Sequence, residues 1–273
     1  MRRRTHLLPL VGLALLVCIP SISAQSDTVS LQWKLTPGEA LFFSTGANLQ
    51  VTLSTSAGVR ETAEGRFEAR EVIRALDVAA LGAIWIEATV EDYRLTVQGG
   101  QPQEQLQPAV SFRVDPDGKV VERFSDPAER PDFPFPLPGR PVRVGESWTR
   151  SATSTTGELV VKGNGTYTLA GFSGGPEGRL ARVMFTNEGT ASETGTILRV
   201  IQTATRTSSK VTGEFEWLID RGRLGRYSQE FTLIADTQVT LPGVPSGLAR
   251  RTAKATARSD PLPPQTLAAP DPN

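Results

Sequence analysis

The hydrophobic and polar positions of this chain alternate with the period of β-strands. In residues 84–91, Ile84, Ile86, Ala88 and Val90 are apolar and the positions between them are mostly polar. This alternation is typical of a strand with one buried face. Similar patterns predict strands at 41–53, 66–78, 84–97, 111–114 and 119–124. No long stretch has the period of an amphipathic helix. We therefore predict an all-β fold of long antiparallel, meandering strands, forming curved sheets or incomplete barrels.

The second half of the chain repeats the order of the first. The segments 144–148, 163–167 and 215–224 resemble 37–41, 63–67 and 111–120, at offsets of 107, 100 and 104 residues. These offsets indicate a diverged duplication with small insertions, giving two related halves. The alternative is chance similarity, because short β-hairpins resemble one another.

Prolines divide the chain into parts. We predict a first β unit at 27–125, a Pro-rich strap at 126–141, a second β unit at 142–259 and a disordered Pro-rich tail at 260–273. The strap holds six prolines, which favour an extended backbone. Its side chains Phe133, Phe135 and Leu137 alternate with these prolines, so we expect the strap to pack its aromatic rings onto a sheet.

The N-terminus has the pattern of an export signal. Three arginines precede an apolar run of 13 residues, and Ile22-Ser23-Ala24 offers a cleavage site. We predict that residues 1–24 are a signal peptide and that the protein is periplasmic or extracellular. Two alternatives are a lipid anchor on Cys18 and a twin-arginine signal. The apolar run is shorter than the ~20 residues of a membrane-spanning helix.

The composition excludes several kinds of chemistry. His6 and Cys18 are the only histidine and cysteine, and both precede the predicted cleavage site, so the mature chain lacks Ser-His-Asp, Cys-His and ordinary zinc sites. We predict no catalytic residue, metal or cofactor. Removing three arginines leaves 26 basic against 29 acidic residues, which argues against nucleic-acid binding.

One predicted strand carries candidate ligand-binding residues. On strand 84–97, Trp85, Glu87 and Tyr93 are predicted to share a face with Glu91. Aromatic and acidic residues in this pattern are typical of a sugar-binding strip or of a solvated β face. Glu87 and Glu91 would lie ~13 Å apart, too far for one glycosidic centre. We therefore retain Trp85, Glu87 and Tyr93 as ligand-binding candidates only.

The last predicted strand has contrasting faces. Arg250, Lys254 and Arg258 occupy one face, with Thr252 and Thr256 between them, and alanines occupy the other face apart from Arg251. Two interpretations of the basic face are protection of an edge strand and a docking stripe for an anionic surface.

The chain resembles secreted bacterial β-rich proteins of a domain-of-unknown-function family. The resemblance covers residues 29–258 and rests on Trp33-Lys34-Leu35, the Pro-rich connector and Val144-Gly145-Glu146-Ser147-Trp148. It implies no catalytic residue. A looser similarity of architecture is to periplasmic lipoprotein carriers, whose curved sheet shelters an acyl chain.

These observations leave three functional hypotheses. The first is an exported, non-enzymatic β protein of the cell envelope or periplasm with a binding or structural role. The second is a carrier of a hydrophobic or acyl ligand in a curved-sheet cavity. The third is a carboxylate-dependent hydrolase. The expected partner is a hydrophobic ligand or an envelope protein.

Overall fold

The computed structural model describes residues 28–79, 82–98, 100–104, 109–116, 118–123, 135–156, 159–197 and 201–263. The predicted signal peptide with Cys18, most of the strap and residues 264–273 of the predicted tail lie outside these ranges. The described residues form 12 strands and no helix, which confirms the all-β prediction. The strands are β1 (Ala40–Thr55), β2 (Arg60–Val78), β3 (Ile84–Val97), β4 (Gln103–Glu104), β5 (Val110–Val114), β6 (Val120–Arg123), β7 (Ser147–Thr156), β8 (Leu159–Gly175), β9 (Gly178–Ile197), β10 (Ile201–Leu218), β11 (Arg223–Leu241) and β12 (Val244–Pro261).

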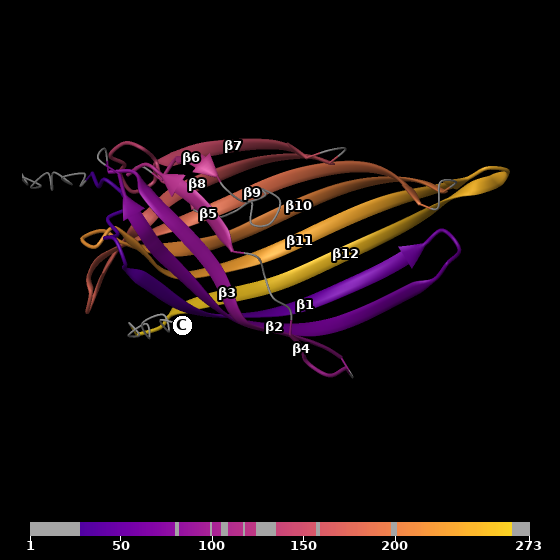
Figure 1. The fold of residues 1–273 in the computed structure, drawn as a ribbon, viewed down its shortest axis with the longest axis horizontal. Coiled ribbons are helices and arrows are strands. Elements are labelled where there is room, and N and C mark those ends of the chain that lie inside the picture. The colour runs from indigo at the N-terminus through magenta and orange to yellow at the C-terminus, as the bar shows by residue number, and fades with distance from the viewer. Residues whose placement is uncertain are drawn as a thin grey trace, which may run out of the picture.

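All the strands belong to one antiparallel sheet. Its order is β6-β5-β3-β2-β1-β12-β11-β10-β9-β8-β7, with β4 paired to β3. The sheet curls so that β3 and β5 turn back in front of the longer strands, and it does not close into a barrel (Figure 1). Among the residues described, no helical segment could cross a bilayer.

The first and last strands of the sequence join the two halves. β1 pairs with β12 from Phe43↔Pro261 to Thr55↔Ala249. The strand that carries Arg250 to Arg258 therefore lies in the middle of the sheet, between β1 and β11, and the edge-strand interpretation is wrong. β12 also continues through Asp260 and Pro261, the first two residues of the predicted tail.

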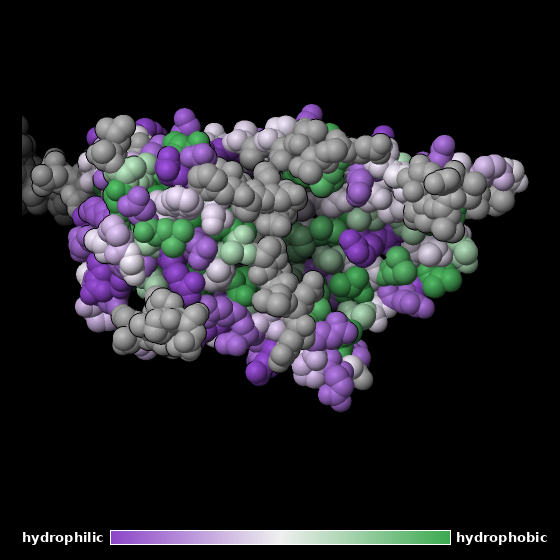
Figure 2. All heavy atoms as spheres, viewed as in Figure 1, coloured by the Kyte–Doolittle hydropathy of each residue, from purple (hydrophilic) through white to green (hydrophobic). Residues whose placement is uncertain are grey.

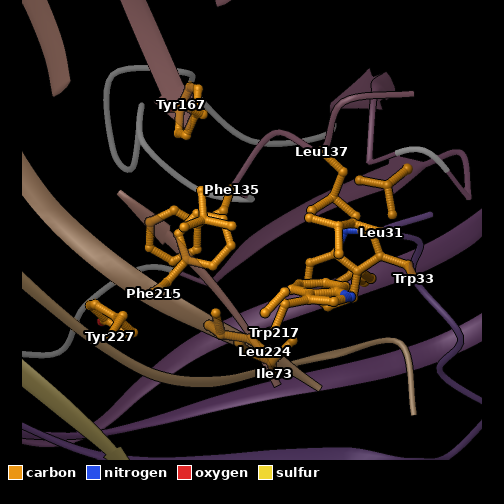
Figure 3. Close-up of a cluster of buried hydrophobic side chains, with 14 of the residues drawn as sticks. Leu31, Trp33, Ile73, Phe135, Leu137, Tyr167, Phe215, Trp217, Leu224 and Tyr227 are labelled. Carbon is orange, nitrogen blue, oxygen red and sulfur yellow. The ribbon is translucent and has the colours of Figure 1, made fainter. Parts of the chain in front are cut away.

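The hydrophobic core fills one end of the curl. We call the face of the sheet that carries Phe43, Phe215 and Trp217 the inner face, and the opposite face the outer face. An extended segment, residues 28–36, enters this end and buries Leu31, Trp33 and Leu35. The rings of Trp33 and Trp217 meet edge to face with centroids 4.8 Å apart (Figure 3). This segment occupies one end of the curled sheet and holds its inner face together.

The described part of the strap also packs on the inner face. Phe135 stacks on Phe215, with ring centroids 4.8 Å apart, and contacts Tyr227 (Figure 3). The Trp148 indole donates a hydrogen bond to the Pro136 carbonyl oxygen at 3.0 Å. The predicted packing of strap aromatics is thus confirmed for Phe135, whereas Phe133 lies outside the described residues.

The two predicted β units share one core. The range 27–125 supplies β1–β6 and buried residues such as Phe43 and Ile86, and the range 142–259 supplies β7–β11, most of β12 and residues such as Val183 and Phe215. The duplication itself stays a prediction.

Candidate ligand-binding site

The three predicted ligand-binding side chains do not share a face. Asp92 has a φ of 51° and lies at a β-bulge, where the register changes from Arg70↔Glu91 to Glu68↔Arg94. The extra residue turns Tyr93 to the inner face, where its ring lies 5.0 Å from that of Phe67. Trp85 and Glu87 alternate with buried Ile84 and Ile86 and so lie on the outer face. The prediction of one shared face is therefore wrong.

Two carboxylates of β3, those of Glu87 and Glu91, are paired with arginines of β2. Arg74 lies 3.6 Å from Glu87 and 3.2 Å from Glu91, and Arg70 lies 3.8 Å from Glu91. The Arg70 guanidinium also lies 4.9 Å above the ring of buried Phe42. This arrangement is typical of an ion-pair network over an apolar patch. Across the described ranges, no group of three or more His, Cys, Asp or Glu side chains could hold a metal ion.

The long strands carry an apolar surface beyond the core. On the inner face, the register places Ala255 between Leu49 and Phe231, and Ala253 between Val51 and Leu233. We call this surface the distal inner face; it consists of Leu49, Val51, Leu53, Phe231, Leu233, Ala235, Ala253, Ala255 and Ala257. Most of these side chains are half-buried, and Leu53 is 38% exposed.

Differences in side-chain size make the distal inner face hollow along its middle strand. Ala253 and Ala255 of β12 are small, whereas their neighbours on β1 and β11 are larger apolar residues, so this part of β12 forms a floor between two apolar walls. Ala257 lies between Ala47 and Gln229. Figure 2, viewed from the same side as Figure 1, shows hydrophobic residues in a hollow over β1, β11 and β12. A concave apolar surface of this kind is typical of a site for a hydrophobic ligand.

Paired polar groups separate this surface from the filled core. The hydroxyls of Thr45 and Ser259 share a hydrogen bond of 2.5 Å, and both residues are buried. Nearby, the Tyr227 hydroxyl donates to the Glu71 carboxylate at 3.0 Å. Because these polar groups have hydrogen-bond partners, they can be buried without a large cost in free energy. They mark where the filled core ends.

The outer face is hydroxyl-rich and has different chemistry. It has two shallow hollows of about 680 and 420 Å³ over β8–β12. Thr166, Thr186, Thr212 and Ser228 line the larger one, and Met184 is its most exposed apolar side chain, at 54%. Threonine and serine hydroxyls on a strand face are well solvated, so this face has less to gain from an apolar ligand than the inner face.

The basic stripe of β12 is largely neutralised on the outer face. Arg250 binds Asp236 through two hydrogen bonds of 2.6 and 2.9 Å, and the bonded guanidinium lowers the pKa of Asp236. Arg258 likewise binds Asp260 and lowers its pKa, with a smaller contribution from Arg226. These pairs leave little free positive charge for the predicted anionic docking stripe.

The distal inner face was partly visible in the sequence. The alternation of alanines on the last strand showed one small apolar face, and odd positions of 41–53 showed another. That these two faces adjoin depends on the pairing of β1 with β12, which joins residues some two hundred positions apart in the chain.

Comparisons with known proteins give no family for this chain. No protein-family model matches it, and no curated protein gives a significant sequence match. Among solved structures, Pseudomonas aeruginosa OccK8 (OprE) is similar at 8% identity, over 82% of this chain and 99% of that chain, with a TM-score of 0.23. OccK2 (OpdF) of the same organism has 9% identity, coverage of 82% and 98%, and a TM-score of 0.14. Likeness at this level assigns neither a fold nor a function.

Proposed function

We propose that this protein is exported and carries a hydrophobic ligand with an acyl chain on the distal inner face, without catalysing a reaction. The observation that carries the proposal is the partly exposed apolar surface over β1, β12 and β11, which continues from the core of the described residues on a concave sheet. Covering such a surface is favourable, at about 25 cal/mol for each Å² of apolar area removed from water.

The filled core supports a carrier role because it fixes the shape of the site. Trp33, Trp217 and Phe135 pack one end of the sheet tightly, so the strands that project from it keep their curvature without a ligand. A preformed site loses less free energy on binding than one that must first become ordered. The small alanines of the floor let an acyl chain approach the backbone of β12 closely.

Export and the absence of catalysis rest on the sequence. Residues 1–24 have the pattern of a signal peptide, and the remaining chain contains neither histidine nor cysteine. The glutamates considered for a hydrolase, Glu87 and Glu91, lie beside arginines rather than in a cleft with free carboxylates. The periplasm and the outside of the cell are the compartments in which such a carrier would act.

A blocking variant tests the proposal. Ala253→Trp places an indole on the floor between Val51 and Leu233, at a position that is only half-buried. Thr252→Trp puts the same ring on the outer face of the same strand. We expect the purified protein to bind a fluorescent long-chain fatty acid. Ala253→Trp should weaken binding about tenfold or more, since ~1.4 kcal/mol of lost contact suffices for that change.

The control decides how the result is interpreted. Thr252→Trp should bind like the unchanged protein, and both variants should unfold at a similar urea concentration. Absence of fatty-acid binding by the unchanged protein, or equal loss in the two variants, would contradict the proposed function.

A further inference from the structure

Arg251 interrupts the apolar surface at its far end. It is the only charged side chain on the inner face of β1, β11 and β12, where its cross-strand neighbours are Leu53 and Ala235. Within the described part of the chain, its guanidinium forms no ion pair or side-chain hydrogen bond. The next residue, Arg250, points to the outer face and is bound to Asp236. Two adjacent arginines of one strand thus differ: one has a partner and the other faces the hollow without one.

The two ends of the distal inner face differ in polarity. Toward the core, the surface stops at the buried pair Thr45 and Ser259, whose hydroxyls already bind each other. Toward the hairpin tips, it ends at Arg251, which is exposed to water. An amphipathic ligand would therefore place its hydrocarbon toward the core and an anionic group toward the tips, where the positive charge lies.

We infer that Arg251 binds the carboxylate of a long-chain fatty acid whose chain lies over Ala253 and Ala255 and ends near Ala257. The inference rests on the proposed function and names its ligand. The six residue-to-residue steps from Arg251 to Ala257 span ~20 Å at the rise of a strand. One leaflet of a bilayer core is ~15 Å thick, half of ~30 Å, so a lipid acyl chain fits along this distance.

The charges around the far end favour a carboxylate over a phosphate group. A single guanidinium matches a single negative charge and can form two parallel hydrogen bonds with a carboxylate. Glu61 lies in the same cross-strand row, because Leu53 pairs with both Glu61 and Arg251. This glutamate would repel a doubly charged phosphate more strongly than a singly charged carboxylate, since only two strand spacings, ~10 Å, separate Glu61 from Arg251.

The test compares two ligands and two arginine variants. A long-chain fatty acid and the alcohol of the same chain length are titrated into the unchanged protein, Arg251→Gln and Arg250→Gln, with displacement of a fluorescent probe as the readout. The unchanged protein should prefer the acid about fivefold, the size expected of one exposed charge-assisted pair. Arg251→Gln should lose this preference and bind the alcohol as before, whereas Arg250→Gln should keep it.

The outcomes separate this inference from the proposed function. Two results would overturn the role of Arg251 without contradicting the proposed carrier function. One is equal binding of acid and alcohol by the unchanged protein, and the other is an unchanged preference for the acid in Arg251→Gln. Tighter binding of a phosphate monoester of the same chain length than of the acid would overturn the choice of ligand. Binding of none of these compounds would remove both proposals.

Discussion

The single hydroxyl proton of Tyr227 on β11 is shared between the two carboxylate oxygens of Glu71 on β2, which lie 3.0 and 3.1 Å from the hydroxyl oxygen. Two strands, β1 and β12, lie between them in the sheet, and the residues are 156 positions apart in the chain. Both are buried. The contact spans the concave side of the sheet and ties the two halves of the chain together where the filled core ends.

We expect Tyr227→Phe to lower the free energy of unfolding. The change removes one hydrogen-bond donor from a buried carboxylate, which costs about 1–3 kcal/mol. Urea unfolding followed by tryptophan fluorescence measures the effect. Tyr93→Phe is the control, because the Tyr93 ring packs on Phe67 and is only half-buried. Equal destabilisation by the two variants would show that the hydroxyl of Tyr227 does not tie the halves together.

Replacing a leucine by alanine should lower the free energy of unfolding by different amounts at the two ends of the inner face. Leu31 is 1% exposed in the core, and Leu53 is 38% exposed on the distal inner face. Leu31→Ala should cost about 2–5 kcal/mol of unfolding free energy, because it leaves a cavity. Leu53→Ala should cost about 0.5 kcal/mol, as for an ordinary surface change.

Chemical denaturation of both leucine variants without added ligand checks this difference. A large loss for Leu53→Ala would mean that the distal inner face is covered by another part of the protein, which contradicts an open binding surface.

Asp260 should contribute to acid sensitivity. Hydrogen bonding to Arg258, with help from Arg226, holds the pKa of Asp260 below its ordinary value of 3.8. A carboxyl whose pKa is lower in the folded than in the unfolded state stabilises the fold when the pH is above the unfolded-state pKa. This stabilisation is lost as the pH falls through the folded-state pKa. The unchanged protein should therefore be more stable than Asp260→Asn at neutral pH, and the difference should shrink below about pH 4.

Unfolding at a series of pH values measures this convergence. In an Arg258→Gln background the effect of Asp260→Asn at neutral pH should be smaller, because the main cause of the lowered pKa is gone. A difference between the proteins that does not depend on pH would contradict the assignment.

The sequence predicted local structure well because alternation is a local signal. The predicted strand 84–97 coincides with β3, and the predicted strand 41–53 lies within β1. It did not predict the bulge at Asp92, which reverses the face of Tyr93. The signal was present, because the apolar positions change from even numbers up to Val90 to odd numbers from Tyr93.

The sequence also did not predict which strands pair over long distances in the chain. The arginines and lysine of β12 fit an edge strand as well as a central one, and only the pairing with β1 decides between them. The same pairing brings Leu49 and Val51 beside the alanines of β12 and so creates the candidate site. Arg251 was visible as the exception on an alanine face, but its position at the end of an apolar surface depends on its neighbours Leu53 and Ala235.

Photocrosslinking locates the ligand directly. A long-chain fatty acid with a photoreactive diazirine at its methyl end is bound to the protein, and the complex is irradiated. Mass spectrometry of the peptides then identifies the crosslinked residues. We expect the label on inner-face residues near the core end of the hollow, such as Ala257, Ala255 and Phe231, and its loss in Ala253→Trp. Labelling of the outer face at Met184 or Thr212, or labelling unaffected by Ala253→Trp, would contradict the claim that the distal inner face carries the acyl chain.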